Sequence, residues 1–324
     1  MPPLYPLRFE PIFKRYLWGG RRLASALGKL IGDGGDYAES WEICDREAER
    51  SVVAEGPLAG ITLSELMSTH GKALLGRHAP QPRFPLLFKF LDAQKTLSVQ
   101  VHPDNHRAAR LDPPDFGKTE AWVVLDADPG SLIYAGLKRG FDRAALEREL
   151  ARGTCELCLH QFQPQPGDCI FLPAGVVHAI GAGLLIAEIQ QASDVTYRLY
   201  DWNRVGADGK PRQLHLEQAL EAIDYAYGPA HPQQPQATER AHVSRLVDCD
   251  EFVLDRWQFD QPQPAGGDER CHFLAVLSGE ISVAGDPANR PLGKGATVLI
   301  PAALGPVLVA PTTGRAVVLD AYLP

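Results

Sequence analysis

Features of secreted, membrane-spanning and nucleic-acid-binding proteins are scarce in this sequence of 324 residues. Its six cysteines are too few and too scattered for a disulfide scaffold, and its N-terminus does not follow the pattern of a signal peptide. The longest apolar stretch, residues 171–187, is broken by a proline, three glycines and a histidine, which argues against a membrane span. The chain has 32 basic and 40 acidic residues, and its net charge of −8 without a basic tail argues against binding to nucleic acid. We therefore expect a soluble, cytoplasmic protein.

The chain is instead rich in turn-forming residues, with 30 glycines and 27 prolines beside 45% apolar positions. This composition favours a mainly β protein with a large core over a helical bundle. Residues 1–80 mix short apolar runs with glycine-rich turns, and we expect them to form a lead-in packed on the next unit. Short strands from residue 81 predict an antiparallel β unit, with helices at 141–152 and 216–225. Asp142 is the expected N-cap of the first helix, and Gly153 is its expected end.

A second β unit is predicted after a segment that has the composition of a linker. Residues 229–238 are rich in Pro and Gln, so we place the first unit at 81–228 and the second at 239–324. The segment GDCIFLPA at 167–174 is echoed by GATVLIPA at 295–302, 128 positions later, which suggests a duplicated jelly roll. In this register His178 falls opposite Pro306, so the second unit cannot reproduce whatever His178 does.

Three polar residues of the first unit are candidate metal ligands. Strand alternation at 97–102 places Gln100 and His102 on one face, where an amide oxygen and an imidazole can converge on one ion. Glu120 shares a strand face with Trp122, and a carboxylate there is costly unless it is paired. A metal would satisfy Glu120, but so would Lys118. For His102 taken alone, a polar lining without metal or a hydrogen-bonded histidine at a strand end is the more common explanation.

The spacing Gly167-x5-Pro173-x-Gly175-x2-His178 resembles the second signature of the cupin superfamily, in which this histidine is a metal ligand. The resemblance implies a fold of two cupin-type jelly rolls, or double-stranded β-helices, with a few short helices. Two His, one Glu and one Gln amide suit Zn²⁺, and they would also hold Fe²⁺ or Mn²⁺.

A narrower resemblance, to type I mannose-6-phosphate isomerases of the short bacterial branch, rests on several segments in family order. These segments are WGG at 18–20, AESWE at 38–42, LLFKFLDAQKTLSVQVHPDN at 86–105, GKTEAW at 117–122, LPAGVVHAIGAG at 172–183, and Glu188 followed by Ser193-Asp194 and Arg198. The matches run from about residue 15 to residue 205, and weaker similarity extends to the C-terminus.

The resemblance implies a zinc-dependent aldose–ketose isomerase that interconverts mannose 6-phosphate and fructose 6-phosphate through an enediolate. The implied roles are one Zn²⁺ per chain on Gln100, His102, Glu120 and His178, a catalytic Arg198, substrate-site lysines Lys95 and Lys118, and a nearby carboxylate Glu188. The proton-transferring base stays open among Glu188, Lys118 and a zinc-bound water. The expected partner is a phosphorylated hexose, and the expected oligomeric state is a monomer or a weak dimer.

Two other functions fit part of the same pattern. Two His and one carboxylate also form the metal site of Fe²⁺-dependent cupin dioxygenases, and a double jelly roll could bind a sugar phosphate without catalysis. Gln100, Lys118 and Arg198 argue against a dioxygenase, because its chemistry does not call for a cationic lining. The complete ligand set argues against a protein that only binds.

Overall fold

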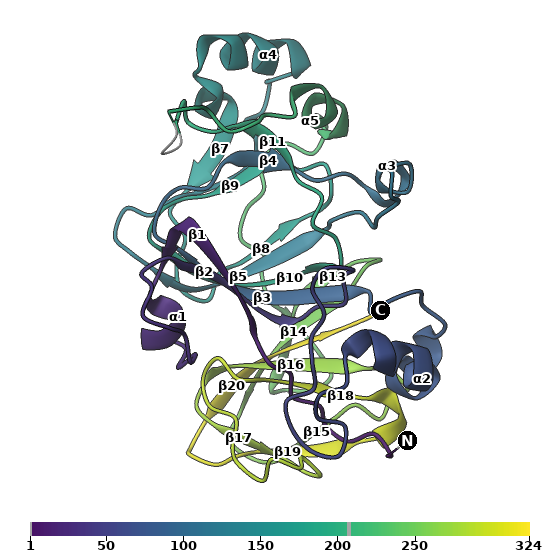
Figure 1. Ribbon diagram of the computed structural model, residues 1–324. Coiled ribbons are helices and arrows are strands. Elements are labelled where there is room, and N and C mark those ends of the chain that lie inside the picture. The colour runs from purple at the N-terminus through teal and green to yellow at the C-terminus, as the bar shows by residue number, and fades with distance from the viewer. Residues whose placement is uncertain (1, 206–208) are drawn as a thin grey trace.

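The computed structural model describes residues 2–205 and 209–324, and every strand pairing among the named strands is antiparallel (Figure 1). One sheet has the order β1 (Ile12–Gly20), β2 (Tyr37–Ile43), β3 (Leu86–Ala93), β10 (Leu184–Gln191), β5 (Glu120–Ala127) and β8 (Cys169–Leu172). The smaller sheet facing it has the order β11 (Tyr197–Tyr200), β4 (Val99–Val101), β9 (His178–Ile180), β6 (Ile133–Leu137) and β7 (Leu159–Phe162). The predicted mainly β fold is confirmed.

The C-terminal part repeats this arrangement on a smaller scale. Its larger sheet has the order β12 (Gln236–Ala237), β13 (Val243–Asp248), β14 (Val253–Phe259), β20 (Ala316–Tyr322), β16 (His272–Ser278) and β18 (Thr297–Ile300). Its smaller sheet has the order β15 (Gln263–Ala265), β19 (Val307–Pro311) and β17 (Ile281–Val283). The segment expected to be a linker lies against the first unit, because its backbone amides donate hydrogen bonds to the carbonyls of Ala135 and Cys169. Its residues 236–237 form strand β12 of the second unit.

The helices are short and lie outside the sheets. They are α1 (Arg22–Ser25), α2 (Leu63–Leu75), α3 (Asn105–Ala108), α4 (Arg143–Arg152), α5 (Leu216–Ala222) and the 3₁₀ turns η1 (Gly76–His78), η2 (Cys155–Cys158) and η3 (Ala302–Leu304). The Asp142 side chain caps α4 by accepting from the Ala145 amide, and Gly153 ends the helix in the left-handed region, as predicted. Helix α5 ends earlier than predicted, because the Asp224 amide donates to the Gly175 carbonyl instead of continuing the helix. Among the described residues, we find no helix with the length and apolarity that a membrane crossing requires.

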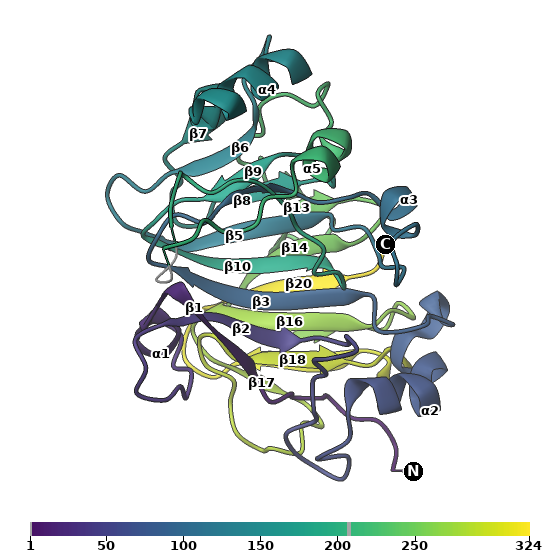
Figure 2. The same cartoon turned by 45° about the horizontal axis from the view of Figure 1, so that its top comes forward.

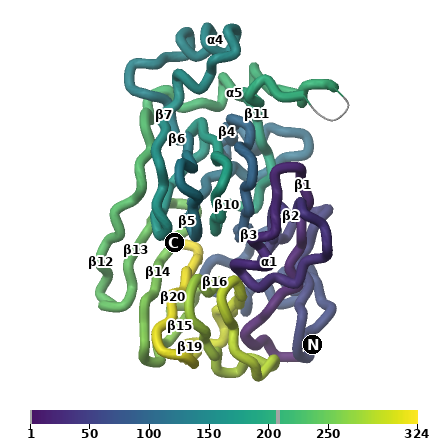
Figure 3. Tube along the Cα trace, turned by 90° about the vertical axis from the view of Figure 1, so that its left-hand side faces the viewer, coloured from purple at the N-terminus to yellow at the C-terminus, as the bar shows by residue number. Residues whose placement is uncertain are grey.

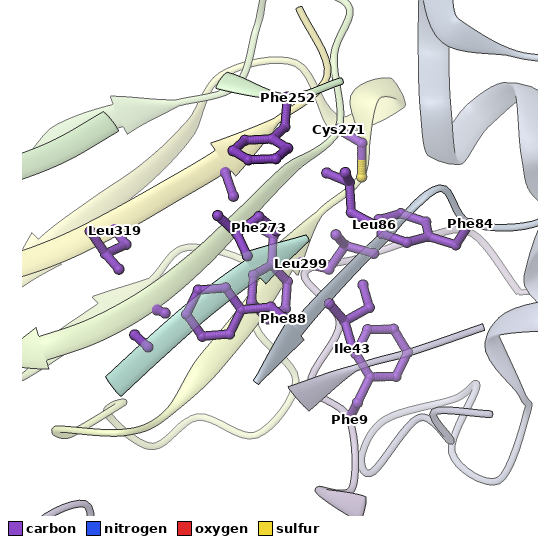
Figure 4. Close-up of a cluster of buried hydrophobic side chains, with 14 of the residues drawn as sticks. Phe9, Ile43, Phe84, Leu86, Phe88, Phe252, Cys271, Phe273, Leu299 and Leu319 are labelled. Atoms are coloured by element: carbon purple, nitrogen blue, oxygen red, sulfur yellow. The ribbon is translucent and has the colours of Figure 1, made fainter. Parts of the chain in front are cut away.

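The two six-stranded sheets pack against each other through a shared apolar core (Figures 2 and 4). Phe88 of β3 and Phe273 of β16 lie in this core, with ring centroids 5.1 Å apart. All eight residues of β3 are buried, and they alternate between its two faces. Even positions, such as Phe88, face the shared core. Odd positions, such as Lys89, face the interior of the first barrel, which is formed by the first two sheets described above. The second barrel therefore covers the back of the sheet that carries the polar interior of the first (Figure 3).

The second barrel carries a histidine at the position that Glu120 occupies in the first. Glu120 pairs with Leu172 and His272 pairs with Ile300, and these partners are separated by the same 128 positions as the repeated segments. His272 Nδ1 lies 2.9 Å from both carboxylate oxygens of Asp320, and its Nε2 lies 3.1 Å from Asp268. Burial alone would lower the pKa of His272, but Asp320 and Asp268 raise it to about 10. His272 is thus paired with a carboxylate at each ring nitrogen, the buried Asp320 and the exposed Asp268, and these three residues form the His272 network.

We expect this network to stabilise the fold at neutral pH and to lose its effect in alkali. Because the pKa of His272 is higher in the folded chain than its ordinary 6.5, its contribution is complete below pH 6.5 and is lost as the pH approaches 10. His272→Gln should lower the free energy of unfolding by about 3–5 kcal/mol at pH 6, since it leaves the buried carboxylate of Asp320 without its cation. Urea unfolding at pH 6 and pH 10 checks this, with the exposed His106→Gln as control. A loss of equal size at both pH values would contradict the prediction.

Candidate active site and metal centre

A cavity of about 350 Å³ lies between the two sheets of the first barrel. Cross-strand pairing explains why polar side chains gather there. Lys89 of β3 pairs with Glu188 of β10, which pairs with Trp122 of β5, so these three side chains form one row on the inner face. On the opposite sheet, Gln100 of β4 pairs with Arg198 of β11 and with His178 of β9, forming a second row. The two rows face each other across the cavity.

His102, Glu120 and His178 converge behind this cavity. Each side chain is 1% exposed, and their ligand atoms all lie within 4.8 Å of one another. Nε2 of His102 lies 3.4 Å from Oε2 of Glu120, and Nε2 of His178 lies 3.3 Å from Oε1. His102 follows the end of β4, Glu120 begins β5 and His178 begins β9, so three strand ends place the group.

The hydrogen bonds of the two histidines direct their Nε2 lone pairs at the carboxylate. Nδ1 of His102 lies 2.8 Å from the Val195 carbonyl and Nδ1 of His178 lies 2.8 Å from the Val176 carbonyl, so each Nδ1 carries the proton that it donates. Burial lowers the pKa of His178 to about 3 and also lowers that of His102, so both rings are neutral. Neutral Nε2 atoms facing a carboxylate repel it unless a cation lies close to them, and in this structure the Lys118 ammonium lies 3.1 Å from Nε2 of His102.

Glu120 provides the negative charge of this group. Burial alone would raise its pKa, but Lys118 holds it well below the usual range. Lys118 Nζ lies 3.0 Å from Oε2 of Glu120, yet within the described chain this oxygen accepts no well-aligned hydrogen bond. Two lone pairs and an incompletely satisfied carboxylate fit a divalent metal ion.

Gln100 is placed to complete the set. Its amide nitrogen lies 3.3 Å from His178 Nε2, and a half-turn of the amide would direct its oxygen to the same place without changing the shape of the side chain. A site with two imidazoles, one carboxylate and one amide oxygen suits Zn²⁺, Fe²⁺ or Mn²⁺.

A buried charged group lies beside the trio. Glu188 Oε1 lies 3.2 Å from Lys89 Nζ and 4.0 Å from Lys118 Nζ. Burial raises the pKa of Glu188 to about 7, although Lys89 acts in the opposite direction. A carboxyl group with this pKa can take up and release a proton near neutral pH.

Two guanidinium groups line the cavity beside Gln100. Arg198 donates to Ser98 Oγ at 3.2 Å and to the Gln213 carbonyl at 3.0 Å, while Arg212 also lines the cavity. Burial and the neighbouring Arg212 lower the pKa of Arg198. Two adjacent cations of this kind suit a phosphate group.

Lys95, expected at the substrate site, is not brought there. Strand β3 ends at Ala93, so Lys95 falls in the following loop, where it is exposed and does not line the cavity. Lys89, Glu39 and Arg212 do line it, and sequence reasoning missed all three. A lysine in the middle of the apolar run LLFKFLD was the available signal for Lys89, because a strand buried on both faces has no place for an unpaired charge.

Comparisons with known proteins show to which family this chain belongs. Residues 7–120 match the model of the phosphomannose isomerase type I catalytic domain. The chain is 36% identical to mannose-6-phosphate isomerase ManA of Bacillus subtilis, over 93% of this chain and 94% of that protein. This chain belongs to the mannose-6-phosphate isomerase family. Family membership confirms the resemblance predicted from the sequence motifs.

Other members of the mannose-6-phosphate isomerase family match over similar lengths. The enzyme of Streptococcus mutans is 32% identical over 91% of this chain and 92% of its own. The crystal structure of the Bacillus subtilis mannose 6-phosphate isomerase superimposes with a TM-score of 0.88 at 29% identity, covering 98% of this chain and 99% of that one. This agreement supports the cupin-type fold along the whole chain.

Proposed function

We propose that this chain interconverts mannose 6-phosphate and fructose 6-phosphate in the cavity of the first barrel, with one Zn²⁺ held by His102, Glu120, His178 and Gln100. The observation that carries the proposal is the convergence of two neutral Nε2 atoms and an ionised carboxylate on one point. The named relatives are isomerases of this substrate, and neither alternative function has comparable support.

The cavity suits a hexose phosphate in size and charge. Its volume of about 350 Å³ is at the lower end of the range for small-molecule sites. We place the phosphate near Arg198 and Arg212 and the reacting carbons near Lys118 and Glu188, because the metal-ligand group lies at that end. Lys95 is left out of the proposed site, since it is exposed outside the cavity.

The proposed reaction moves a proton between two neighbouring carbons. The base takes the proton from C2 of the open-chain aldose, and the electron pair forms the C1–C2 double bond of an enediolate while O1 takes up the charge. Return of the proton to C1, with transfer of the hydroxyl proton from O2 to O1, gives the ketose. A bound Zn²⁺ would supply Lewis acidity that stabilises charge on the two oxygens.

Residues of the chain perform the remaining tasks. We assign the proton transfer between C2 and C1 to Glu188, whose pKa of about 7 permits both steps near neutral pH. Lys118, directly beside Glu120 and His102, is placed to donate hydrogen bonds to developing negative charge. Arg198 supplies a permanent positive charge that binds the substrate anion without donating a proton.

We also propose that the chemistry is confined to the first unit, residues 81–228, together with the lead-in, residues 1–80. All cavity-lining residues lie between Tyr16 and Arg212. Beyond the proposed linker at 229–238, the second unit, residues 239–324, carries the closed His272 network at the position of Glu120. It therefore serves to cover the sheet of the first unit.

Metal removal tests the proposed function. The purified chain is treated with a chelator, and formation of fructose 6-phosphate from mannose 6-phosphate is followed before and after addition of Zn²⁺. We expect activity to disappear on chelation, to return with Zn²⁺, and to parallel a metal content near one ion per chain. Undiminished activity in metal-free protein would overturn the proposal, and recovery with Fe²⁺ or Mn²⁺ alone would overturn the assignment of zinc.

A pair of variants tests where the phosphate binds. Arg212→Gln should raise KM for mannose 6-phosphate roughly tenfold, because one charge-assisted hydrogen bond is lost. Lys95→Gln should change KM by less than about twofold, as expected of an exposed charge. Steady-state kinetics of both variants decide between the two positions, and a larger effect of Lys95→Gln would show that the phosphate lies outside the cavity.

A further inference from the structure

The ammonium group of Lys89 lies between two buried carboxylates from different strands. Its Nζ is 3.2 Å from Glu188 Oε1 on β10 and 3.7 Å from Glu39 Oε2 on β2. Glu39 Oε2 also accepts a 2.6 Å hydrogen bond from Nε1 of Trp41. The side chains of all three charged residues line the same cavity.

The register of the sheet fixes this arrangement. Trp41 pairs with Lys89, and Lys89 pairs with Glu188, so the three side chains lie in one row across β2, β3 and β10. Glu39 precedes Trp41 by two residues and therefore shares its face of β2. The Trp41 hydrogen bond anchors Glu39 on the far side of Lys89 from Glu188, and the two carboxylates compete for one cation.

We propose that Glu39 is a positioning residue for the proposed isomerase: it divides the charge of Lys89 between two carboxylates, so that Glu188 stays able to take up and return a proton. The proposal rests on the assignment of the proton transfer to Glu188. It also gives the N-terminal lead-in a part in the chemistry, because Glu39 is the carboxylate that β2 contributes to the cavity.

Four charged residues act on Glu188 from the surrounding strands. Lys89 on β3 and Lys118 before β5 favour its ionised form, whereas Glu120 on β5 and Glu39 on β2 disfavour it. Removing the charge of Glu39 takes away one of the two opposing carboxylates and leaves Lys89 free to pair with Glu188 alone. Both changes lower the pKa of Glu188.

The test compares pH profiles of the zinc-loaded enzyme and its Glu39→Gln variant. Because the proposed base works in its ionised form, kcat/KM falls on the acid side as Glu188 is protonated, and we expect this limb to move about one unit to lower pH in Glu39→Gln. Glu39→Asp, which keeps the charge, should move the limb less. The phosphate of the substrate titrates near pH 6 in every variant, so differences between variants isolate the protein group.

Glu42→Gln is a matched control from the same strand. Glu42 is also buried, but it pairs with Lys29 at 2.6 Å and lies outside the cavity. This variant should leave the acid limb in place whatever it does to stability. An acid limb that does not move in Glu39→Gln would overturn the proposal. If KM is raised at the same time, Glu39 would instead be a ligand of the sugar.

A second measurement separates this inference from the proposed function. Glutamate labelled with ¹³C at the side-chain carboxyl allows Glu188 to be titrated by NMR in the zinc-loaded protein, with Glu188→Gln identifying its signal. A lower titration midpoint in Glu39→Gln supports the coupling, and an equal midpoint overturns it. If the wild-type chain fails to isomerise mannose 6-phosphate, the proposed function falls, while this titration still decides whether Glu39 controls Glu188.

Discussion

Replacing Glu120 by Gln is expected to remove the metal ion and the isomerase activity together. Glu120 is the carboxylate of the trio, with oxygens 3.3 and 3.4 Å from the Nε2 atoms of His178 and His102. A Gln amide has the same shape, but it is neutral and carries hydrogen-bond donors. Its NH₂ group can donate to either Nε2 atom and so satisfy the site without a metal. Loss of several kcal/mol of charge stabilisation corresponds to a fall in kcat/KM of roughly 10³-fold or more.

Metal analysis and activity of the purified Glu120→Gln protein check this prediction. Thermal unfolding gives a third readout, because a metal that binds only the folded chain raises its stability by mass action. A chelator should therefore lower the Tm of the wild-type protein and leave that of Glu120→Gln unchanged. Glu120→Gln protein that still holds one metal ion per chain would show that Glu120 is not a ligand.

The sequence marked the candidate metal ligands that the structure brings close together, His102, Glu120 and His178, through signals that are local. Strand alternation placed Gln100 and His102 on one face, and the spacing around Pro173 and Gly175 marked His178. The structure places His102, His178 and Glu120 at neighbouring strand ends, and Gln100 in the middle of β4 beside His178. Each signal lies within a few residues of the side chain that it concerns, so a single sequence contains it.

The rest of the cavity could not be predicted in this way. Lys95 follows the motif of strand β3 and was predicted to lie at the substrate site. Strand β3 ends two residues before it, so Lys95 lies in the next loop and is exposed to solvent. Lys89 lies inside an apolar run whose two faces are both buried, so alternation gives no orientation. Arg212 reaches the cavity because the backbone of His215 bonds to the Arg198 carbonyl, a contact that no periodicity reveals.

The packing of the two barrels against each other could not be predicted from the sequence either. The repeated segments predicted a second copy and correctly aligned β8 with β18, because the GDCIFLPA and GATVLIPA segments contain these strands. They carried no information on how the copies pack. The contact of Phe88 with Phe273 joins residues far apart in the chain, and strand alternation alone does not show which face of either strand meets the other barrel.

Replacing Glu188 by Gln is expected to abolish turnover while the metal stays bound. Glu188 is 2% exposed and lies between Lys89 and Lys118, outside the group of candidate metal ligands. The Gln amide keeps the shape of the side chain but cannot accept a proton from carbon, so kcat should fall by about 10²–10⁴-fold. Metal content near one ion per chain in this variant separates it from Glu120→Gln.

The pKa of Glu188 predicts the direction in which activity changes with pH. Burial raises the pKa of Glu188 to about 7, so the fraction of wild-type enzyme with an ionised base increases as the pH rises through neutrality. The acid limb of kcat/KM near pH 7 should therefore be absent from the residual activity of Glu188→Gln. Exchange of the C2 proton of mannose 6-phosphate with deuterated solvent should fall with turnover, because both depend on the same proton removal.

Retention of turnover and of the acid limb in Glu188→Gln would transfer the proton step to Lys118. Lys118 Nζ lies 4.0 Å from Glu188 Oε1 and 3.1 Å from Nε2 of His102, so it faces the same end of the cavity. Lys118 Nζ also forms an ion pair with Oε2 of Glu120 at 3.0 Å, so its ammonium group is already engaged by a candidate metal ligand. Burial raises the pKa of Glu188 to about 7, which lets this carboxyl group take up and release a proton near neutral pH, and this is why we propose Glu188 as the base.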